Sequence, residues 1–209
     1  MIEQPPPPPA RSRQVLVVAG LIVIAGAAVI IVALVLQSRS PITAPRLTPP
    51  LPAGSRQRAP DFEITMYQGQ EEVGRQKLRL SQVLAKGKPV VLNFFAGLCP
   101  PCRAEMPDLQ QRYETGGKEW YLMLAVDVGP YTGLGTREDG KALLRELNIT
   151  FPAGTVFDED ILAAYQIFGM PSTFFITPDG MIVRKQIGLM TPEQMDVYIA
   201  ELIQASAPK

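Results

Sequence analysis

The stretch VVLNFFAGLCPPCRAEMPDL, residues 90–109, decides the fold because it joins an apolar run directly to a closely spaced pair of cysteines. Residues 90–96 are almost continuously apolar, which is typical of a buried central strand. A glycine and a leucine then turn the chain, and two prolines follow Cys99. Proline suits the first turn of a helix, where its missing N–H is not needed. The stretch therefore predicts a strand, a turn and a helix that begins at Pro100.

Cys99 and Cys102 are the only cysteines in the 209 residues, and the chain contains no histidine. A zinc site needs four ligands, so carboxylates would have to complete one that is built on two thiolates. Covalent haem attachment requires a histidine directly after the second cysteine, where this chain has Arg103. A purely structural disulfide would close too small a loop to constrain the unfolded chain much. The sequence therefore favours a reversible dithiol, with no metal and no other cofactor.

The expected position of the pair at the start of a helix gives the two cysteines different roles. Helical residues three apart have Cα atoms about 5 Å apart, within the range of a disulfide. Free amides and the helix dipole lower the pKa of Cys99, which predicts it as the nucleophile and Cys102 as the resolving thiol. Glu105 lies on the same helical face and is a candidate to take the proton of Cys102. On spacing alone, Glu105 is equally well a solvated helical glutamate.

Charge is distributed unevenly along the chain. Six basic residues and one acidic residue give residues 1–59 a net charge of +5, and the remaining 14 basic and 19 acidic residues give residues 60–209 a net charge of −5. Nucleic-acid binding requires a basic face, which this mildly acidic part does not offer. The absence of histidine excludes Ser-His-Asp and Cys-His catalysis and imidazole metal ligands.

The first 59 residues are predicted to attach the rest of the chain to a lipid bilayer. Residues 1–14 are predicted to be a proline-rich, disordered tail, which the family resemblance given below would place in the cytoplasm. Residues 15–36 contain neither charge nor proline, and as a helix they would span about 33 Å, enough for a hydrocarbon core of about 30 Å. The apolar region of a signal peptide is shorter, about 7–15 residues, so an uncleaved transmembrane anchor is expected. Residues 37–59 are predicted to form a proline-rich linker, and residues 60–209 a folded domain.

Within that domain, apolar runs alternate with segments of helical period, which predicts an α/β sheet covered on both faces. A polar turn containing Gly69 is expected between the first two strands, and a loop at 129–135. The helix at 191–204 is expected to be capped by Thr191. The predicted strands are 62–67, 77–80, 90–96, 120–128, 155–157, 173–177 and 181–187. One predicted helix begins at Pro100, and three further helices are predicted at 137–147, 159–166 and 191–204.

Four segments together resemble the membrane-anchored thioredoxin-like proteins of the TlpA/ResA/CcmG type, with a redoxin (AhpC/TSA-like) domain. They are APDF (59–62), LSQVLAKGKPVVLNFFAGLCPPCRAEMPDL (80–109), FGMPSTFFITPDG (168–180) and the final helix. The likeness covers nearly all of 59–204. A C-x-x-C pair alone is a weak signal, but its combination with C-R-x-E-M-P and G-x-P-S-T-F-F-I is specific.

The resemblance implies a role for individual residues. Cys99 and Cys102 match the active-site pair, and Glu105 matches the acidic residue that such proteins keep near the second cysteine. Pro171 matches a cis-proline that packs opposite the disulfide, so Met170 would offer its backbone to a bound substrate.

The surface around the first cysteine departs from the family pattern. The family usually has tryptophan immediately before that cysteine, whereas this chain has Leu98. Leu98, Pro100 and Pro101 are expected to form part of the substrate-binding surface, and because this surface departs from the family pattern, the resemblance does not identify the partner.

The resemblance also implies an architecture and an activity. The fold would be thioredoxin-like, with an N-terminal β-hairpin extension and a central helical insert, preceded by one transmembrane helix. The domain would face outward from the bacterial plasma membrane. It would act as a thiol-disulfide oxidoreductase that reduces disulfide-containing proteins, for example apocytochrome c, and is itself recharged by a transmembrane thiol-reducing electron donor.

Two alternative functions remain open at the level of the sequence. A peroxiredoxin-like thiol peroxidase shares the APDF segment, but its P-x-x-x-T-x-x-C pattern matches neither cysteine. A non-enzymatic module for thiol binding or metal-site assembly is the second alternative. Copper-delivery relatives use a wider cysteine spacing and a histidine, and both are absent here.

Overall fold

The structure, a computed structural model, describes residues 56–207. Within these residues the chain forms one seven-stranded mixed sheet in the order β2-β1-β5-β4-β3-β6-β7. The strands are β1 (Glu63–Gln68), β2 (Lys77–Arg79), β3 (Val90–Phe95), β4 (Leu122–Asp127), β5 (Ala153–Thr155), β6 (Ser172–Ile176) and β7 (Ile182–Ile187). The central strands β3, β4 and β5 are parallel, whereas β1, β2, β6 and β7 pair antiparallel to their neighbours.

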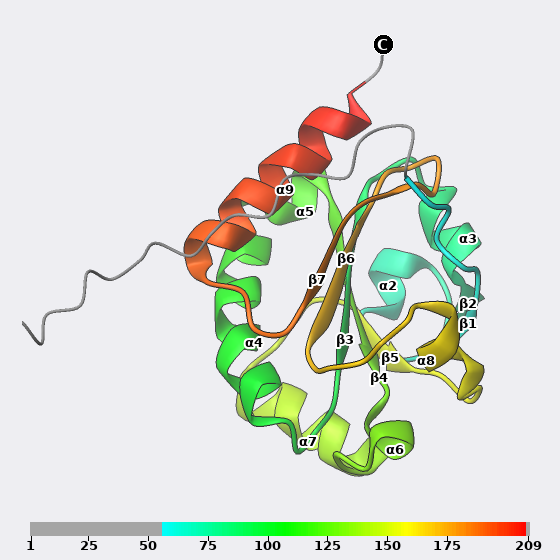
Figure 1. Cartoon of the computed structure of the whole chain (residues 1–209), viewed down its shortest axis with the longest axis vertical. Helices are drawn as coiled ribbons and strands as arrows, with labels where there is room; N and C mark the ends of the chain where they lie inside the picture. The colour runs from blue at the N-terminus through cyan, green and yellow to red at the C-terminus, as the bar shows by residue number, and fades with distance from the viewer. Residues whose placement is uncertain (1–55, 208–209) are drawn as a thin grey trace, which may run out of the picture. The chain divides into compact units, whose positions relative to one another are not determined.

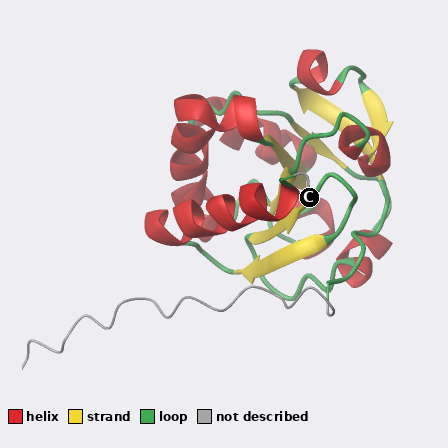
Figure 2. Ribbon diagram, turned by 90° about the horizontal axis from the view of Figure 1, so that it is seen from above, coloured by secondary structure: helices red, strands yellow, loops and turns green. Residues whose placement is uncertain are grey.

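Helices cover both faces of the sheet, as Figures 1 and 2 show. They are α2 (Gln70–Val73), α3 (Leu80–Leu84), α4 (Pro100–Arg112), α5 (Lys118–Trp120), α6 (Gly129–Thr132), α7 (Arg137–Glu146), α8 (Asp160–Ala164) and α9 (Pro192–Ser206). A π-helical turn, η2 (Tyr113–Gly117), connects α4 to α5.

The alternation of side chains along β3 divides the core into two clusters. Val91 and Phe95 pack in one cluster with apolar residues of α4, α7 and α9. Val90, Leu92 and Phe94 pack in the other with apolar residues of α2, α3 and α8. All of these strand residues are buried, because successive side chains of a covered strand point to opposite faces. Asn93 lies on the same face of β3 as Val91, toward α4 and α9.

The sequence predicted most of these elements, but some boundaries and short helices differ. The polar turn at Gly69 contains the one-turn helix α2, and the expected loop 129–135 begins with α6. Trp120 ends α5 instead of starting β4, and β5 lies two residues earlier than expected. These are helices of four residues or fewer and a three-residue strand, too short for an apolar period to reveal.

None of the helices in the described part of the chain is both long enough and apolar enough to cross a bilayer. The anchor predicted at 15–36, the tail at 1–14 and nearly all of the linker at 37–59 lie outside the described residues. The described residues include the end of β3, Cys99 and the whole of α4, which contains Cys102.

Candidate active site

The two cysteines form a disulfide at the point where β3 ends and α4 begins. Their Cα atoms are 5.3 Å apart. Cys99 is the N-cap of α4, with Pro100 and Pro101 in the first turn, and its Sγ accepts a hydrogen bond from the N–H of Cys102 at 3.2 Å. A sulfur held at a helix N-terminus faces unpaired amides and the positive end of the helix dipole. The predicted start of the helix is therefore correct, and because Pro100 and Pro101 have no N–H, the amide of Cys102 is the one that donates to Sγ of Cys99.

The turn that carries Cys99 is fixed by close packing against α7. A Cβ added to Gly97 would lie 2.3 Å from the carbonyl carbon of Asp139 and 2.4 Å from the amide nitrogen of Gly140. Leu98 donates its N–H to the carbonyl of Leu134 at 2.8 Å. Only glycine permits this approach of two backbones, so residue 97 sets the position of the disulfide relative to α7.

Glu105 is buried, although it is a glutamate on a helix. Its Oε1 accepts from Nδ2 of Asn93 at 3.0 Å, and its Oε2 accepts from the N–H of Met190 at 2.8 Å. Asn93 also donates to Oγ1 of Thr173 at 2.9 Å. Burial raises the pKa of Glu105 to about 7, while the two hydrogen bonds act in the opposite direction. A carboxyl group that titrates near neutral pH can both accept and return a proton.

The loop that precedes β6 contains the only cis peptide bond of the described residues, between Met170 and Pro171. The carbonyl of Pro171 accepts from the N–H of Gly188 at 2.8 Å, which joins this loop to the one between β7 and α9. Neither the N–H nor the carbonyl of Met170 has a hydrogen-bond partner within residues 56–207. Because β3 pairs with β6 at Phe94 and Ser172, this loop leaves the sheet at the same end as the disulfide.

The disulfide itself is almost covered. The exposed fraction is 2% for Cys99 and 1% for Cys102, whereas Leu98, Pro100 and Pro101 around it are exposed. A partner protein therefore has to contact the surrounding surface closely before its sulfur can reach Sγ of Cys99.

Sequence reasoning missed three parts of this region. The backbone amide of Met190 and the hydroxyl of Thr173 join the Glu105 network only because the fold brings distant segments together. Asp127, at the end of β4, is fully buried and accepts from the hydroxyl of Tyr67 at 3.0 Å and the N–H of Gly129 at 2.9 Å. Burial raises the pKa of Asp127 to about 6. In the sequence, Asp127 is recognisable as the acidic residue at the end of the apolar run that forms β4.

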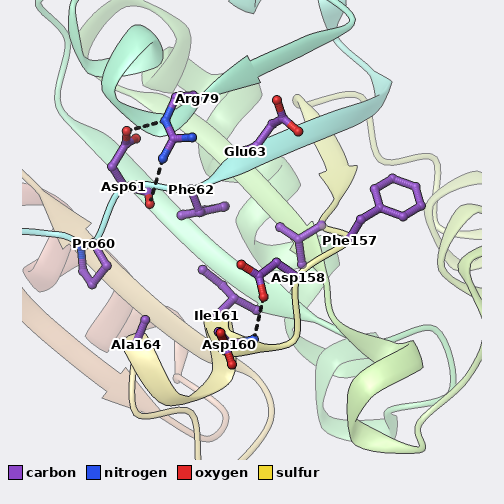
Figure 3. Close-up of a pocket in the computed structure, with 11 residues that line it drawn as sticks. Pro60, Asp61, Phe62, Glu63, Arg79, Phe157, Asp158, Asp160, Ile161 and Ala164 are labelled. Atoms are coloured by element: carbon purple, nitrogen blue, oxygen red, sulfur yellow. Dashed lines mark hydrogen bonds and ion pairs between the residues drawn. The ribbon is translucent and has the colours of Figure 1, made fainter.

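A separate cavity of about 360 Å³ lies at the edge of the sheet formed by β1 and β2 and beside α8. Figure 3 shows its acidic side chains and the Arg79–Asp61 ion pair. It contains no cysteine, and β1 and β2 are separated from β3 by β5 and β4. Among residues 56–207, no three Cys, His, Asp or Glu side chains gather as metal ligands.

Comparison with known proteins identifies relatives with the same chemistry. The AhpC/TSA family model matches residues 55–185. The chain is 33% identical over 144 residues to the thiol-disulfide oxidoreductase ResA of Oceanobacillus iheyensis, covering 69% of this chain and 70% of that protein. It is 28% identical over 141 residues to ResA of Bacillus subtilis strain 168, covering 68% and 72% respectively.

Solved structures share the fold. The pneumococcal exposed lipoprotein thioredoxin of Streptococcus pneumoniae strain TIGR4 superposes with a TM-score of 0.56 and 26% identity, over 68% of this chain and 99% of that one. StoA from Bacillus subtilis superposes with a TM-score of 0.54 and 21% identity, over 67% and 96%. The domain therefore has the thioredoxin-like fold that the sequence predicted.

Proposed function

We propose a function that proceeds from one premise: this chain belongs to the AhpC/TSA family and, within it, to the ResA-like thiol-disulfide oxidoreductases. It is a thiol-disulfide oxidoreductase whose redox pair is Cys99–Cys102. Its role is that of a reductant of protein disulfides on the outer side of a membrane. The observation that carries this proposal is the disulfide at the N-terminus of α4 in the same structural unit as the buried carboxyl of Glu105.

The reaction consists of two exchanges between sulfur atoms. In the reduced protein, the thiolate of Cys99 attacks one sulfur of a substrate disulfide, the substrate S–S bond breaks, and one substrate thiolate leaves. The thiolate of Cys102 then attacks Sγ of Cys99, which releases the second substrate thiolate and forms the Cys99–Cys102 disulfide. Two electrons pass to the substrate, and a dithiol donor returns them to the cysteine pair. Glu105 takes the proton of Cys102 before the second attack.

Substrate binding is assigned to the surface around the pair. Leu98, Pro100 and Pro101 are exposed beside Cys99. Next to Pro171, the N–H and the carbonyl of Met170 have no hydrogen-bond partner among residues 56–207. An extended substrate segment pairs with these backbone groups while its cysteine approaches Cys99. Disulfide-containing extracytoplasmic proteins, such as an apocytochrome c, are the substrate class, and a transmembrane thiol carrier is the electron donor.

One observation supports a membrane tether, and another supports a position outside the cytoplasm. Residues 15–36 form an apolar, uncharged stretch of a length suited to a bilayer. One structural relative with 26% identity is described as an exposed lipoprotein. Both favour a domain tethered at the cell surface.

A trapping experiment tests the assigned roles. The Cys102→Ser variant of the full-length chain, expressed in its membrane, should accumulate mixed disulfides with substrates, because the first exchange proceeds and the second does not. The Cys99→Ser variant should accumulate none. Adducts are detected on non-reducing gels and identified by mass spectrometry. Equal yields from both variants would contradict the assignment of Cys99 as nucleophile.

The reduction potential of the pair tests the direction of exchange. A value near or below that of thioredoxin, about −270 mV, supports a reductant, whereas a value near that of DsbA, about −120 mV, would make the protein an oxidant. Equilibration of the full-length chain with dithiothreitol or glutathione gives this value.

A further inference from the structure

Two carboxyl groups are buried among residues 56–207, those of Glu105 and Asp127, and the exchange reaction as proposed uses only Glu105. Both lie on the face of the sheet that carries the disulfide. Met123 and Ala125 of β4 pack in the same core cluster as the two cysteines, and Asp127 follows two residues later, so its side chain points to that face. The hydrogen bonds of Glu105 reach β6, whereas Asp127 belongs to β4, on the other side of β3. The disulfide at the end of β3 therefore has a buried carboxyl group on either side.

Four elements meet at the carboxyl group of Asp127. Its Oδ1 accepts from the N–H of Gly129 in α6 at 2.9 Å, and its Oδ2 accepts from the hydroxyl of Tyr67 in β1 at 3.0 Å. Helix α7 packs against it at Gly140, where an added Cβ would lie 2.2 Å from Oδ2. The register partner of Asp127 on β3 is Phe95, in the last position of that strand. These contacts fix the carboxyl group directly behind the turn that leads to the cysteines.

Gly140 is also the residue at which α7 contacts this turn. A Cβ added to Gly97 would lie 2.4 Å from the amide nitrogen of Gly140. The turn itself is closed by a hydrogen bond from the N–H of Cys99 to the carbonyl of Ala96 at 3.2 Å. The backbone of one residue of α7 thus lies between the carboxyl group of Asp127 and the turn. Because backbone contacts do not relax by a change of rotamer, a displacement on one side is transmitted to the other.

Few charges compensate a negative charge on Asp127. The neighbouring elements α6, β3 and β5 contain no charged residue, and β1 presents the neutral hydroxyl of Tyr67, over whose ring Lys141 of α7 lies at 5.0 Å. The positive charge of Arg137 favours ionisation of Asp127, and the negative charge of Asp139 opposes it. Burial outweighs both and raises the pKa of Asp127 to about 6. The group is therefore mostly ionised at neutral pH, as a buried anion.

We propose that Asp127 is a positioning residue for the nucleophile: through Gly140 and Gly97 it holds the turn that places Cys99, and its negative charge disfavours the Cys99 thiolate. This inference rests on the proposed exchange function and concerns the regulation of the same cysteine pair. A buried charge acts over a longer distance than an exposed one, because little water or salt screens it. A less stable thiolate makes the reduced pair less stable, so the pair gives up its electrons more readily. Asp127 therefore biases the pair toward the role of a reductant.

The titration of Cys99 tests the effect of the charge. In the reduced full-length chain that carries Cys102→Ser, Cys99 is the only thiol, and its alkylation by iodoacetamide is followed across pH by mass spectrometry. Adding Asp127→Asn removes the charge and keeps the shape of the side chain. We expect the pKa of Cys99 to fall by about half a unit to one unit, which is about a threefold to tenfold gain in thiolate below that pKa. A role of Asp127 in stability alone would leave this pKa unchanged.

The reduction potential is a second measure, taken on the full-length chain with both cysteines. Asp127→Asn should make the pair about threefold to tenfold easier to reduce, a shift of about 15–30 mV to more positive values in equilibration with glutathione. Glu138→Gln is the matched control, because it removes a negative charge from α7 where the side chain is 80% exposed. Water and salt screen that charge, so we expect the wild-type pKa of Cys99 and the wild-type potential.

The positioning effect is tested by Gly140→Ala, which keeps the charge but adds a methyl group against Asp127. At high pH, where Cys99 is fully ionised, the alkylation rate reaches a plateau that reports the placement of the thiolate and no longer its pKa. This plateau should fall by about threefold or more in Gly140→Ala and should remain in Asp127→Asn. A folded Gly140→Ala protein with the wild-type plateau would overturn positioning through α7.

The remaining outcomes separate this proposal from the exchange function. A Cys99 titration that Asp127→Asn leaves unchanged or moves to higher pH, or that Glu138→Gln moves equally, would overturn the proposal and leave the exchange function standing. If circular dichroism shows that Asp127→Asn does not fold, Tyr67→Phe replaces it: without the hydrogen bond from Tyr67, Asp127 ionises at higher pH, so the pKa of Cys99 should again fall, and an unchanged pKa would overturn the proposal. If the unaltered chain exchanged with no disulfide, the exchange function would be wrong, while the titration of Cys99 would still decide the effect of Asp127.

Discussion

The raised pKa of Glu105 results from the packing of α4 against β3. The α4 helix buries it beside Asn93, and the loop after β7 supplies the N–H of Met190, so both carboxyl oxygens already have a donor. Burial dominates over these two hydrogen bonds and raises the pKa of Glu105 to about 7. Each oxygen has a further lone pair, so the group can still accept the proton of a thiol. The role in proton transfer stays a proposal that kinetics can test.

The Glu105→Gln variant should slow the resolution step, in which Cys102 attacks the mixed disulfide. In the wild type the rate should rise with pH as Glu105 ionises near pH 7. In the variant we expect a rate at pH 7 that is lower by about tenfold to a hundredfold, with the rise displaced to higher pH. Single-turnover quenched-flow measurements across this pH range give both profiles.

The matched control for this variant is Glu119→Gln, which removes an exposed glutamate of α5 far from the cysteines. Its profile should coincide with that of the wild type. Coincident profiles for Glu105→Gln and the wild type would remove Glu105 from the mechanism.

At the scale of elements, the site depends on α7 packing against the turn between β3 and α4. Gly97 contacts the backbone of Asp139 and Gly140, and Gly140 in turn leaves room for the carboxylate of Asp127, whose Oδ2 would lie 2.2 Å from an added Cβ. A contact between backbones cannot relax by a change of rotamer, so an added methyl group has to move the turn or the helix.

The Gly97→Ala substitution should therefore lower the free energy of unfolding by about 1–3 kcal/mol. Urea denaturation of the oxidised full-length chain, followed by circular dichroism, measures this change. Gly87→Ala serves as the comparison, since nothing lies within 4 Å of its added Cβ and only its φ of +79° is unfavourable. If Gly97→Ala is no less stable than the wild type, α7 does not fix the turn.

For the whole molecule, two buried carboxyls make stability depend on pH. Folding raises the pKa of Asp127 from 3.8 to about 6 and that of Glu105 from 4.5 to about 7, mainly through burial. A carboxyl with a raised pKa in the folded state binds its proton more tightly when folded. Its contribution is therefore fully present below the unfolded pKa and is lost as pH rises through the folded pKa.

The free energy of unfolding of the oxidised protein should accordingly fall between about pH 4.5 and pH 7, by at most about 1.4 kcal/mol per pH unit for each of the two groups. Urea titrations at several pH values measure this slope. Glu105→Gln and Asp127→Asn should each flatten it. A stability that rises with pH over this interval would show that the two carboxyls are ionised in the folded protein.

How far the sequence predicts the structure differs between the fold and the site. The apolar run 90–96, the prolines after Cys99 and the cap at Thr191 each act through neighbours in the chain, so the strand, the start of α4 and the start of α9 were predicted correctly. The short helices α2 and α6 escaped prediction because a single turn contains no repeat of the apolar period. Likewise, spacing placed Glu105 beside Cys102 but left open whether water or protein surrounds it.

The sequence alone determined which residues form the redox pair of this protein, because its only two cysteines are three residues apart at the predicted start of a helix, and it favoured a reversible disulfide over a metal or haem site because the chain has no histidine. Only the tertiary structure decided what surrounds that disulfide. Met190, Thr173 and Asn93 come from three separate segments, and Phe168 and Leu189 belong to loops that meet through the Gly188–Pro171 hydrogen bond. The physical reason is that burial and long-range hydrogen bonds depend on which segments become neighbours in space, and local patterns in a sequence carry no information about that distance.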